Sequence, residues 1–315
     1  SADRSVDVLL RVNPDYVPHG MNEGSATGSR RGCAFGLDFK NGEVSKALAI
    51  IARNSVIRFQ GFQMHIGTGI REPQDYSRAL KCLPELLHQA DVAGFDVRVF
   101  DAGGGFASMT TREFTSGEML LYGGFGKLPD GPGRGSLPTF KDFARAIADE
   151  LLCNFPPNEL PELILEPGRC IASPNQFLLL SVHYTKERPD AGKWLITDGG
   201  LGTVTMPTYY EYHEVFLCND VGRSREEKVT IIGPACFAGD IVYRNKWMPV
   251  VHPGEVLAVM DSGAYFLALE SSFGFSRPPI ILVNEEGIHV VRRRETYDDM
   301  TARDHIIETT KEEAL

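Results

Sequence analysis

Apolar positions follow two alternating patterns in the first half of the chain. Four short segments are apolar at nearly every position, which predicts strands of a parallel sheet covered on both faces. Between them, apolar residues recur at helical spacing, as Val44, Leu48 and Ile51 do. The strands are predicted at 6–12, 59–65, 97–102 and 162–166, and the helices at 43–52, 73–93 and 139–154. This order predicts an α/β unit that binds ligands at the C-terminal ends of its strands.

The pattern changes after about residue 175. Strand-like runs follow one another without helices between them, which predicts a second, antiparallel β domain. These strands are expected at 177–183, 194–198, 215–219, 229–232, 241–244, 256–260, 280–283 and 289–293. The glycine-rich residues 108–137 show no clear period and predict an extended surface loop. The expected regions are an α/β unit at 1–175, a β domain at 176–295 and a polar tail at 296–315.

Composition narrows the partners and the compartment. The 315 residues suit two domains, or one large barrel with an addition, and the net charge of −10 argues against nucleic acid or an anionic membrane as the main partner. No apolar run is long enough to span a membrane, and no signal peptide is visible. The six cysteines are scattered without a CxxC pair, which favours reduced thiols over disulfides or a zinc site. We therefore predict a cytoplasmic protein.

Two glycine-containing strand ends are candidate ligand sites. In Glu166-Pro167-Gly168-Arg169, a carboxylate and a guanidinium flank a bare backbone, which suits a ligand with a ring nitrogen and a phosphate. A turn closed by an internal ion pair explains this motif equally well. Gly103-Gly104-Gly105 can form a backbone nest for a phosphate, and a tight turn without a ligand is the alternative.

Three further strand ends carry chemically useful side chains. His65 can stack on a planar ring while Thr68 reaches a phosphate, although a hydrogen-bonded core histidine is as frequent. Cys236 lies in a Gly-Pro-Ala-Cys turn and can donate a proton, although such a cysteine is more often simply packed. Tyr265 can direct its phenol at a cofactor, and a buried tyrosine with a satisfied hydroxyl is the alternative. None of these motifs decides the function by itself.

Taken in order, the motifs resemble those of the pyridoxal-phosphate-dependent decarboxylases of the alanine-racemase fold type. They are HIGTG at 65–69, DAGGGF at 101–106, EPGRC at 166–170, GPACFAGD at 233–240 and DSGAYF at 261–266. Segments 11–14, 35–37, 198–200 and 293–296 match as well, so the resemblance runs from about residue 6 to about residue 300. This family includes the diaminopimelate, ornithine and arginine decarboxylases. It implies a (β/α)8 barrel followed by a β domain.

The resemblance also implies pyridoxal 5′-phosphate as the cofactor and a role for each motif. His65 would stack on the pyridine ring, and Glu166 would pair with the protonated ring nitrogen. The phosphate would be held by Thr68, Gly103, Gly104, Gly105, Gly168, Arg169 and Tyr265. Cys236 would be the proton donor and would reach into a partner's site, because the family forms head-to-tail homodimers with shared sites. The implied activity is that of a lyase that decarboxylates an amino acid.

The chain departs from the family pattern near its start. The family binds its cofactor covalently through a lysine upstream of the strand matched by residues 6–12, and neither Lys40 nor Lys46 stands in that motif. Only four barrel-type strands are predicted where a closed barrel needs eight, so the sequence shows the C-terminal half of the barrel. We therefore expect that a lysine-bearing N-terminal segment is absent from this sequence or is supplied by another chain.

Two substrate-side positions lack an expected charge. Phe237 stands where diaminopimelate and ornithine enzymes carry an acid, and Met206 stands where diaminopimelate enzymes place an arginine. Both favour an amino acid with an acylated or otherwise modified distal end, as in siderophore or antibiotic pathways, over diaminopimelate, ornithine, lysine or arginine. The alternatives are a diaminopimelate, ornithine, lysine or arginine decarboxylase, a racemase of the same fold type, and a non-catalytic binding or regulatory relative. The acid of EPGR favours decarboxylation over racemisation.

Overall fold

The computed structural model describes residues 5–108, 110–133, 138–204 and 207–305, without the side chains of residues 207 and 208. The chain divides into two compact units. The first comprises residues 1–177, 209–215 and 259–264, and the second comprises residues 178–208, 216–258 and 265–315. Within the described ranges, no helix combines the length and the apolar character needed to cross a membrane.

A five-stranded parallel sheet forms the centre of the first unit. Its strands lie in the order β2-β1-β3-β4-β6, and every neighbouring pair is parallel. The strands are β1 (Val6–Asn13), β2 (Leu37–Asp38), β3 (Ile57–Gln63), β4 (Val99–Asp101) and β6 (Glu162–Ile164). Because β1, β3, β4 and β6 are parallel neighbours, their C-terminal ends meet at one edge. This confirms the predicted α/β class with a parallel sheet.

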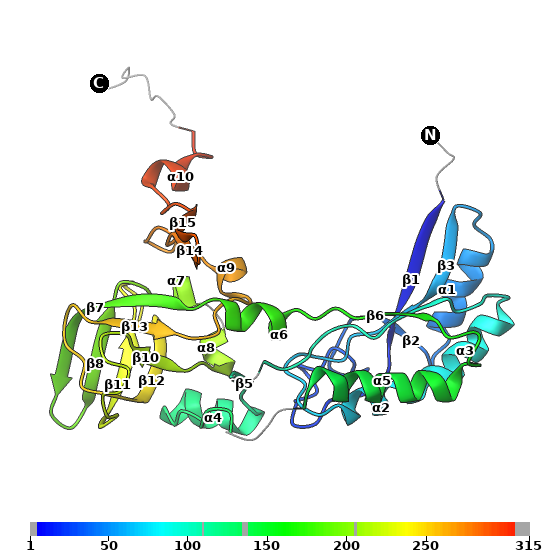
Figure 1. Cartoon of the computed structure of the whole chain (residues 1–315), viewed down its shortest axis with the longest axis horizontal. Coiled ribbons are helices and arrows are strands. Elements are labelled where there is room, and N and C mark those ends of the chain that lie inside the picture. The colour runs from blue at the N-terminus through cyan, green and yellow to red at the C-terminus, as the bar shows by residue number, and fades with distance from the viewer. Residues whose placement is uncertain (1–4, 109, 134–137, 205–206, 306–315) are drawn as a thin grey trace, which may run out of the picture. The chain divides into compact units, whose positions relative to one another are not determined.

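Helices pack against this sheet through the apolar faces that the sequence predicts (Figure 1). They are α1 (Glu43–Ala52), α2 (Gln74–Ala79), α3 (Leu83–Val92) and α5 (Phe140–Asn154). The single helix predicted at 73–93 is wrong, because a 3-10 turn, η1 (Leu80–Cys82), separates α2 from α3. Pro84 lies in the first turn of α3 and has no amide hydrogen to donate, so it is tolerated at a helix start and not inside a continuous helix.

The described residues within 108–137 form more regular structure than the sequence predicts. They contain β5 (Arg112–Glu113) and α4 (Ser116–Phe125). Thr115 and Glu118 form a capping box at the start of α4, in which each side chain bonds the other residue's backbone amide. The expectation of a loop throughout is therefore wrong, because this cap stabilises a helix that contains three glycines.

The edge strand β6 exposes apolar side chains. Leu163, Ile164 and Leu165 are 36–38% exposed, and none of the described strands pairs with the far side of β6. The sequence predicts a buried strand here. Among the described strands, however, only β4 pairs with β6.

The second unit is built around a six-stranded sheet in the order β10-β13-β7-β8-β11-β12. Pairs β7–β8 and β11–β12 are antiparallel, whereas β8 and β11 are parallel. The strands are β7 (Leu178–Arg188), β8 (Gly192–Thr197), β10 (Val215–Leu217), β11 (Glu227–Ile232), β12 (Ile241–Met248) and β13 (Val256–Val259). A unit rich in β-sheet therefore follows the α/β unit. The alternation of apolar and polar residues does not reveal that β8 and β11 are parallel.

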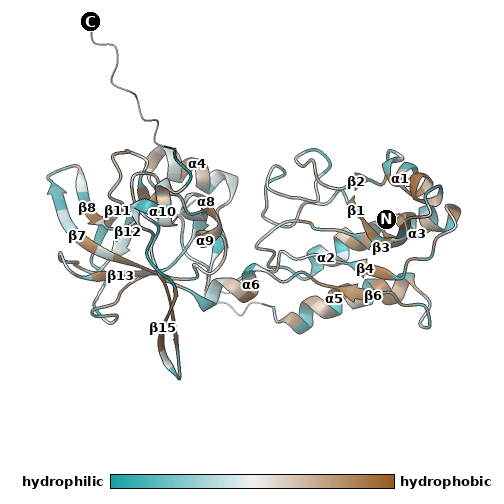
Figure 2. Ribbon diagram, turned by 90° about the horizontal axis from the view of Figure 1, so that it is seen from above, coloured by the Kyte–Doolittle hydropathy of each residue, from teal (hydrophilic) through white to brown (hydrophobic). Residues whose placement is uncertain are grey.

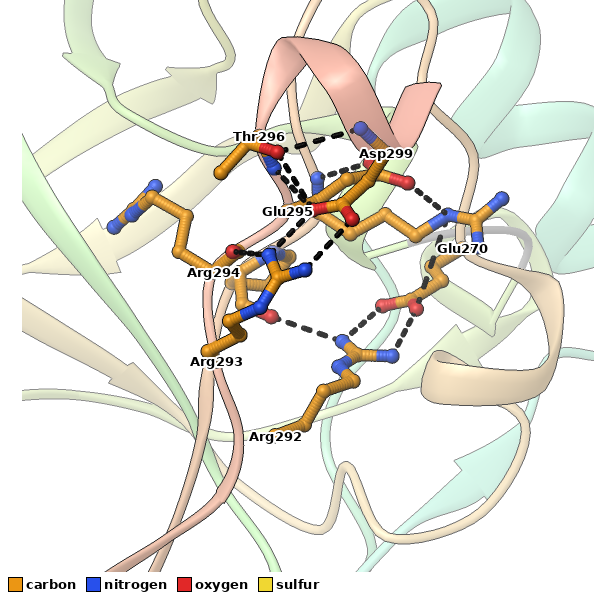
Figure 3. A network of polar contacts seen from close by, with 9 residues as sticks. Glu270, Arg292, Arg293, Arg294, Glu295, Thr296 and Asp299 are labelled. Carbon is orange, nitrogen blue, oxygen red and sulfur yellow. Dashed lines mark hydrogen bonds and ion pairs between the residues drawn. The ribbon is translucent and has the colours of Figure 1, made fainter. Parts of the chain in front are cut away.

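An ion-pair network stabilises the end of the second unit (Figure 3). The hairpin β14 (Ile280–Asn284) and β15 (Gly287–Arg292) leads into α10 (Tyr297–Thr301). Figure 2 colours most of β15 as hydrophobic. The Arg292 guanidinium donates to both carboxylate oxygens of Glu270, whose side chain is 5% exposed. Arg293 pairs with Asp299 in the first turn of α10, so the charges join the hairpin to its flanking segments.

Candidate active site

His65 lies in the loop that follows β3. Its Nδ1 accepts a hydrogen bond of 3.2 Å from the backbone amide of Gly104, so Nδ1 carries no proton. Burial lowers the pKa of His65 below its ordinary value, and the positive charge of Arg11 lowers the pKa further. The imidazole is therefore neutral at pH 7, which suits stacking on a ring better than pairing with a charge.

The three glycines after β4 occupy positions where a side chain does not fit. A Cβ on Gly103 would lie 2.2 Å from the Met64 carbonyl oxygen, and a Cβ on Gly104 would lie 2.1 Å from the Glu166 carbonyl oxygen. Gly105 has a φ of +100° and is equally crowded by the loop after β3. The backbone after β4 therefore contacts the backbone after β3 and after β6, which brings three of the predicted motifs together.

Asp101 and Glu166 place two carboxyl groups beside these glycines. The Gly103 amide donates to Asp101 Oδ1 at 2.8 Å, and the Glu166 amide donates to the Gly103 carbonyl oxygen at 2.9 Å. Burial raises the pKa of Asp101 to about 6, and the neighbouring charge of Glu166 contributes to that rise. Glu166 itself is exposed, so its carboxylate is accessible to a ligand at this edge of the sheet.

Arg169 begins the short helix α6 (Arg169–Ala172) and is buried. Its Nη1 donates to Glu211 Oε2 at 2.5 Å. His213 Nε2 lies 3.2 Å from the same Oε2, and His213 Nδ1 lies 2.9 Å from the Met260 carbonyl oxygen. The ion pair of the EPGR turn is thus made with a residue 42 positions away and not within the motif.

Glu113 adds a second carboxyl group to this cluster. It lies opposite Glu211 in the antiparallel pair formed by β5 and β9 (Glu211–Tyr212). Burial raises the pKa of Glu113 to about 7, and the charge of Glu211 contributes to the rise while Arg169 opposes it. A Cβ on Gly69 would lie 3.7 Å from the Glu113 side chain, so the cluster borders the loop that carries His65. Glu113 and Glu211 escaped the sequence analysis, because two-residue strands give no periodic signal.

Cys236 and Phe237 lie on the turn after β11 in the second unit, and both are exposed. The buried Asp240 builds this turn, because its carboxylate accepts hydrogen bonds from the amides of Ala235 at 2.7 Å and Leu201 at 2.5 Å. Asp240 also escaped the sequence analysis as a site residue. Asp240 is nevertheless the last residue of the GPACFAGD motif, so the sequence did mark its position.

An apolar cavity of about 300 Å³ lies beside Phe237 in the second unit. The Phe237 and Phe273 rings meet edge to face with centroids 6.4 Å apart. The cavity is lined by Asp198, Gly199, Gly200, Leu201, Gly202, Thr203, Pro234, Ala235, Phe237, Asp240, Ser271, Phe273, Phe275 and Ser276. The lining thus combines three phenylalanine rings with the carboxyl groups of Asp198 and Asp240.

Besides Cys236 and Phe237, two further predicted site residues are not among those that contact the glycine cluster in the first unit. Tyr265 belongs to the second unit, has a φ of +69° and is 44% exposed where it precedes α9 (Phe266–Leu269). Met206 lies outside the described residues. The contacts described above therefore bring together His65, the glycines at 103–105 and Glu166, all of which belong to the first unit.

The first unit fits the chemistry of pyridoxal phosphate. The backbone of Gly103, Gly104 and Gly105 leaves no room for a side chain, and successive glycines of this kind can direct main-chain amides toward a phosphate. A Cβ on Gly168 would meet nothing within 4 Å, so this segment is open on its side-chain face. A neutral imidazole and an accessible carboxylate lie beside the glycines, as ring stacking and pairing with a ring nitrogen require.

Comparison with known proteins agrees with this site. The family profile described as pyridoxal-dependent decarboxylase, pyridoxal binding domain, matches residues 2–173. The diaminopimelate decarboxylase of Methanocaldococcus jannaschii is 28% identical over 302 residues, which cover 95% of this chain and 63% of that protein. That of Bacillus subtilis is 27% identical over 303 residues, which cover 95% of this chain and 64% of that protein.

A solved structure shows the same similarity. The crystal structure of the M. jannaschii enzyme superimposes with a TM-score of 0.80 at 28% identity, over 97% of this chain and 65% of that one. The chain therefore spans just under two thirds of the length of these relatives. The fold and the glycine-lined strand ends define a pyridoxal-phosphate-binding α/β protein. The profile covers more than half of the sequence, and the chain belongs to the pyridoxal-dependent decarboxylase family.

Proposed function

We propose that this protein decarboxylates an amino acid with pyridoxal 5′-phosphate as its cofactor. The observation that carries the proposal is the convergence of His65, the crowded Gly104 and Glu166 at one edge of the parallel sheet. The three adjacent strand ends would thereby provide ring stacking, phosphate binding and a partner for a ring nitrogen. The family membership supports the same cofactor.

Each residue has a definite task in this proposal. His65 would stack on the pyridine ring, and Glu166 would keep the ring nitrogen protonated. The amides after β4, the Thr68 hydroxyl and the Arg169 guanidinium would hold the phosphate. Bound pyridoxal phosphate would accept the electron pair that remains when CO2 leaves. The Cys236 thiol is the proposed donor of the proton that replaces the carboxylate on that carbon.

The substrate has two candidates. The names of the relatives make diaminopimelate the first. The cavity beside Phe237 favours the second, an amino acid whose distal end is uncharged, because the rings of Phe237, Phe273 and Phe275 offer apolar contacts to such a group. Comparing CO2 release from diaminopimelate, lysine and an Nε-acyl-lysine decides between them.

We further propose a homodimer in which Cys236 serves the site of the partner subunit. Its exposed position on the turn after β11 supports this arrangement. Lys40 Nζ is paired with Asp15 at 2.7 Å and Lys46 is exposed on α1, so neither is offered as the cofactor-binding lysine. The molar mass in solution, measured by light scattering, tests the dimer.

The proposed function is tested by titrating the protein with pyridoxal 5′-phosphate and following CO2 release from carboxyl-labelled amino acids. We expect saturable binding that weakens in His65→Ala, and CO2 release that falls in Cys236→Ser while binding persists. Absence of binding would overturn the cofactor assignment. Binding without CO2 release from any amino acid would favour a non-catalytic relative.

A further inference from the structure

The buried ion pair between Arg169 and Glu211 has a consequence for cofactor binding. Arg169 is 8% exposed and Glu211 is 1% exposed, so water screens neither charge well. We propose that Glu211 is a positioning residue: it holds the Arg169 guanidinium in the orientation that binds the cofactor phosphate. This inference rests on the proposed function, because it assigns Arg169 to the phosphate.

The geometry supports an orienting role. A guanidinium is a planar fork of five donors, so a carboxylate that holds one end fixes the plane in which the remaining donors point. Glu211 holds Arg169 at Nη1, with 2.5 Å between the bonded atoms. Arg169 also follows Gly168, whose side-chain face is open. The Glu211 contact therefore fixes one end of the guanidinium of the residue that follows Gly168.

Glu211 is itself fixed from two sides. Its backbone belongs to β9, which pairs with β5, and its Oε2 lies 3.2 Å from His213 Nε2. The other ring nitrogen of His213 faces the Met260 carbonyl oxygen at 2.9 Å. The orientation of Arg169 is thereby tied to two segments that are distant in sequence, 209–215 and 259–264.

Electrostatics keeps Glu211 ionised for this role. Burial alone would raise the pKa of Glu211, but hydrogen bonding to His213 and the positive charge of Arg169 outweigh burial and hold the pKa below its ordinary value. Around this carboxylate stand Arg169 from α6, His213 from the segment after β9, and Glu113 from β5. A carboxylate that stays charged binds the guanidinium at neutral pH and below.

The test uses two ligands that differ only by the phosphate. Pyridoxamine 5′-phosphate and pyridoxamine both lack the aldehyde that reacts with surface lysines, and quenching of protein fluorescence measures their affinities. In Glu211→Ala we expect the preference for the phosphorylated ligand to fall about tenfold, as for loss of one charge-assisted contact, while pyridoxamine affinity is unchanged. Glu211→Gln keeps the shape and one acceptor, and we expect a smaller loss.

A matched control and distinct outcomes complete the experiment. Glu150→Gln makes the same chemical change in the Lys81–Glu150 pair, which contacts none of the predicted cofactor residues, and we expect its preference to equal that of the unmodified protein. An unchanged or increased preference in Glu211→Ala overturns the inference. If circular dichroism shows Glu211→Ala to be unfolded, the folded Glu211→Gln decides by the same criterion. No preference in the unmodified protein would instead overturn the proposed function.

Discussion

Glu113 and Glu211 face each other directly across the β5–β9 pair, yet the two carboxyl groups ionise differently. The pKa of Glu211 is held low by His213 and Arg169 against the effect of burial, whereas burial raises the pKa of Glu113 to about 7. Glu211 thus stays ionised over the pH range in which Glu113 takes up a proton. Such divergence between adjacent acids is characteristic of functional sites.

The raised pKa of Glu113 predicts a pH-dependent stability. Between pH 4.5 and about 7 the folded chain binds more protons than the unfolded chain, so the free energy of unfolding falls as pH rises through this window. Glu113→Gln removes that dependence and should stabilise the protein by about 2 kcal/mol at pH 8, with little effect at pH 4. Urea unfolding at both pH values measures the change.

Glu118 provides a control of opposite sign. Its hydrogen bond to Arg112 lowers the pKa of Glu118 to about 2, so its contribution is present above pH 4.5 and is lost as pH falls. Glu118→Gln should therefore destabilise the protein at neutral pH. Equal shifts in the same direction for both variants would contradict the assignment.

Gly104→Ala should damage both folding and cofactor binding. Its Cβ would lie 2.1 Å from the Glu166 carbonyl oxygen, so the two strand ends would have to separate. We expect a loss of about 2 kcal/mol or more in unfolding free energy and weaker binding of pyridoxal phosphate. Gly124→Ala in α4 is the matched control, because nothing lies within 4 Å of its Cβ and alanine favours the helix by up to about 1 kcal/mol. Equal effects of the two variants would argue against a crowded glycine cradle.

His65 should titrate below its ordinary value of 6.5. Because burial and Arg11 lower the pKa of His65, its contribution to stability is present above pH 6.5 and is lost as pH falls below it. Arg11→Met keeps the apolar stem over Phe35 and removes the charge, so the pKa should rise. NMR titration of the imidazole carbons measures both midpoints. A midpoint at or above 6.5 in the unmodified protein would refute the prediction.

Glu270→Gln should loosen the terminal hairpin without unfolding the first unit. Arg292 would lose a charged partner that is largely buried, which costs about 2 kcal/mol locally. Hydrogen exchange at 288–292 in β15 should accelerate, while exchange in β3 should not change. Uniform acceleration in both units would show that the network supports more than the hairpin.

The meeting of His65, Gly104 and Glu166 could be predicted from the sequence. Each follows an apolar strand, and the C-terminal ends of neighbouring parallel strands lie at one edge of a sheet. The partner of Arg169 could not be predicted in this way. Glu211 reaches it through a two-residue strand far along the chain, and no local spacing encodes that contact.

Local sequence signals could have corrected two of the wrong predictions. Thr115 and Glu118 form the Thr-x-x-Glu pattern of a capping box, but Gly123 and Gly124 concealed the helix that follows it. Pro84 marked the start of α3 inside a period that otherwise continued unbroken. In the first case the glycines outweighed the signal of a helix start, and in the second case the apolar period did. The parallel pairing of β8 with β11 had no such signal, because strand direction is set by the connection and not by side-chain alternation.

Among the described strands only β4 pairs with β6, so a further strand could join the parallel sheet at this edge. With Leu163, Ile164 and Leu165 partly in solvent, a strand supplied in trans gains both main-chain hydrogen bonds and a hydrophobic contact by joining this edge. Binding of a second polypeptide with a matching strand should therefore protect the β6 amides from hydrogen exchange.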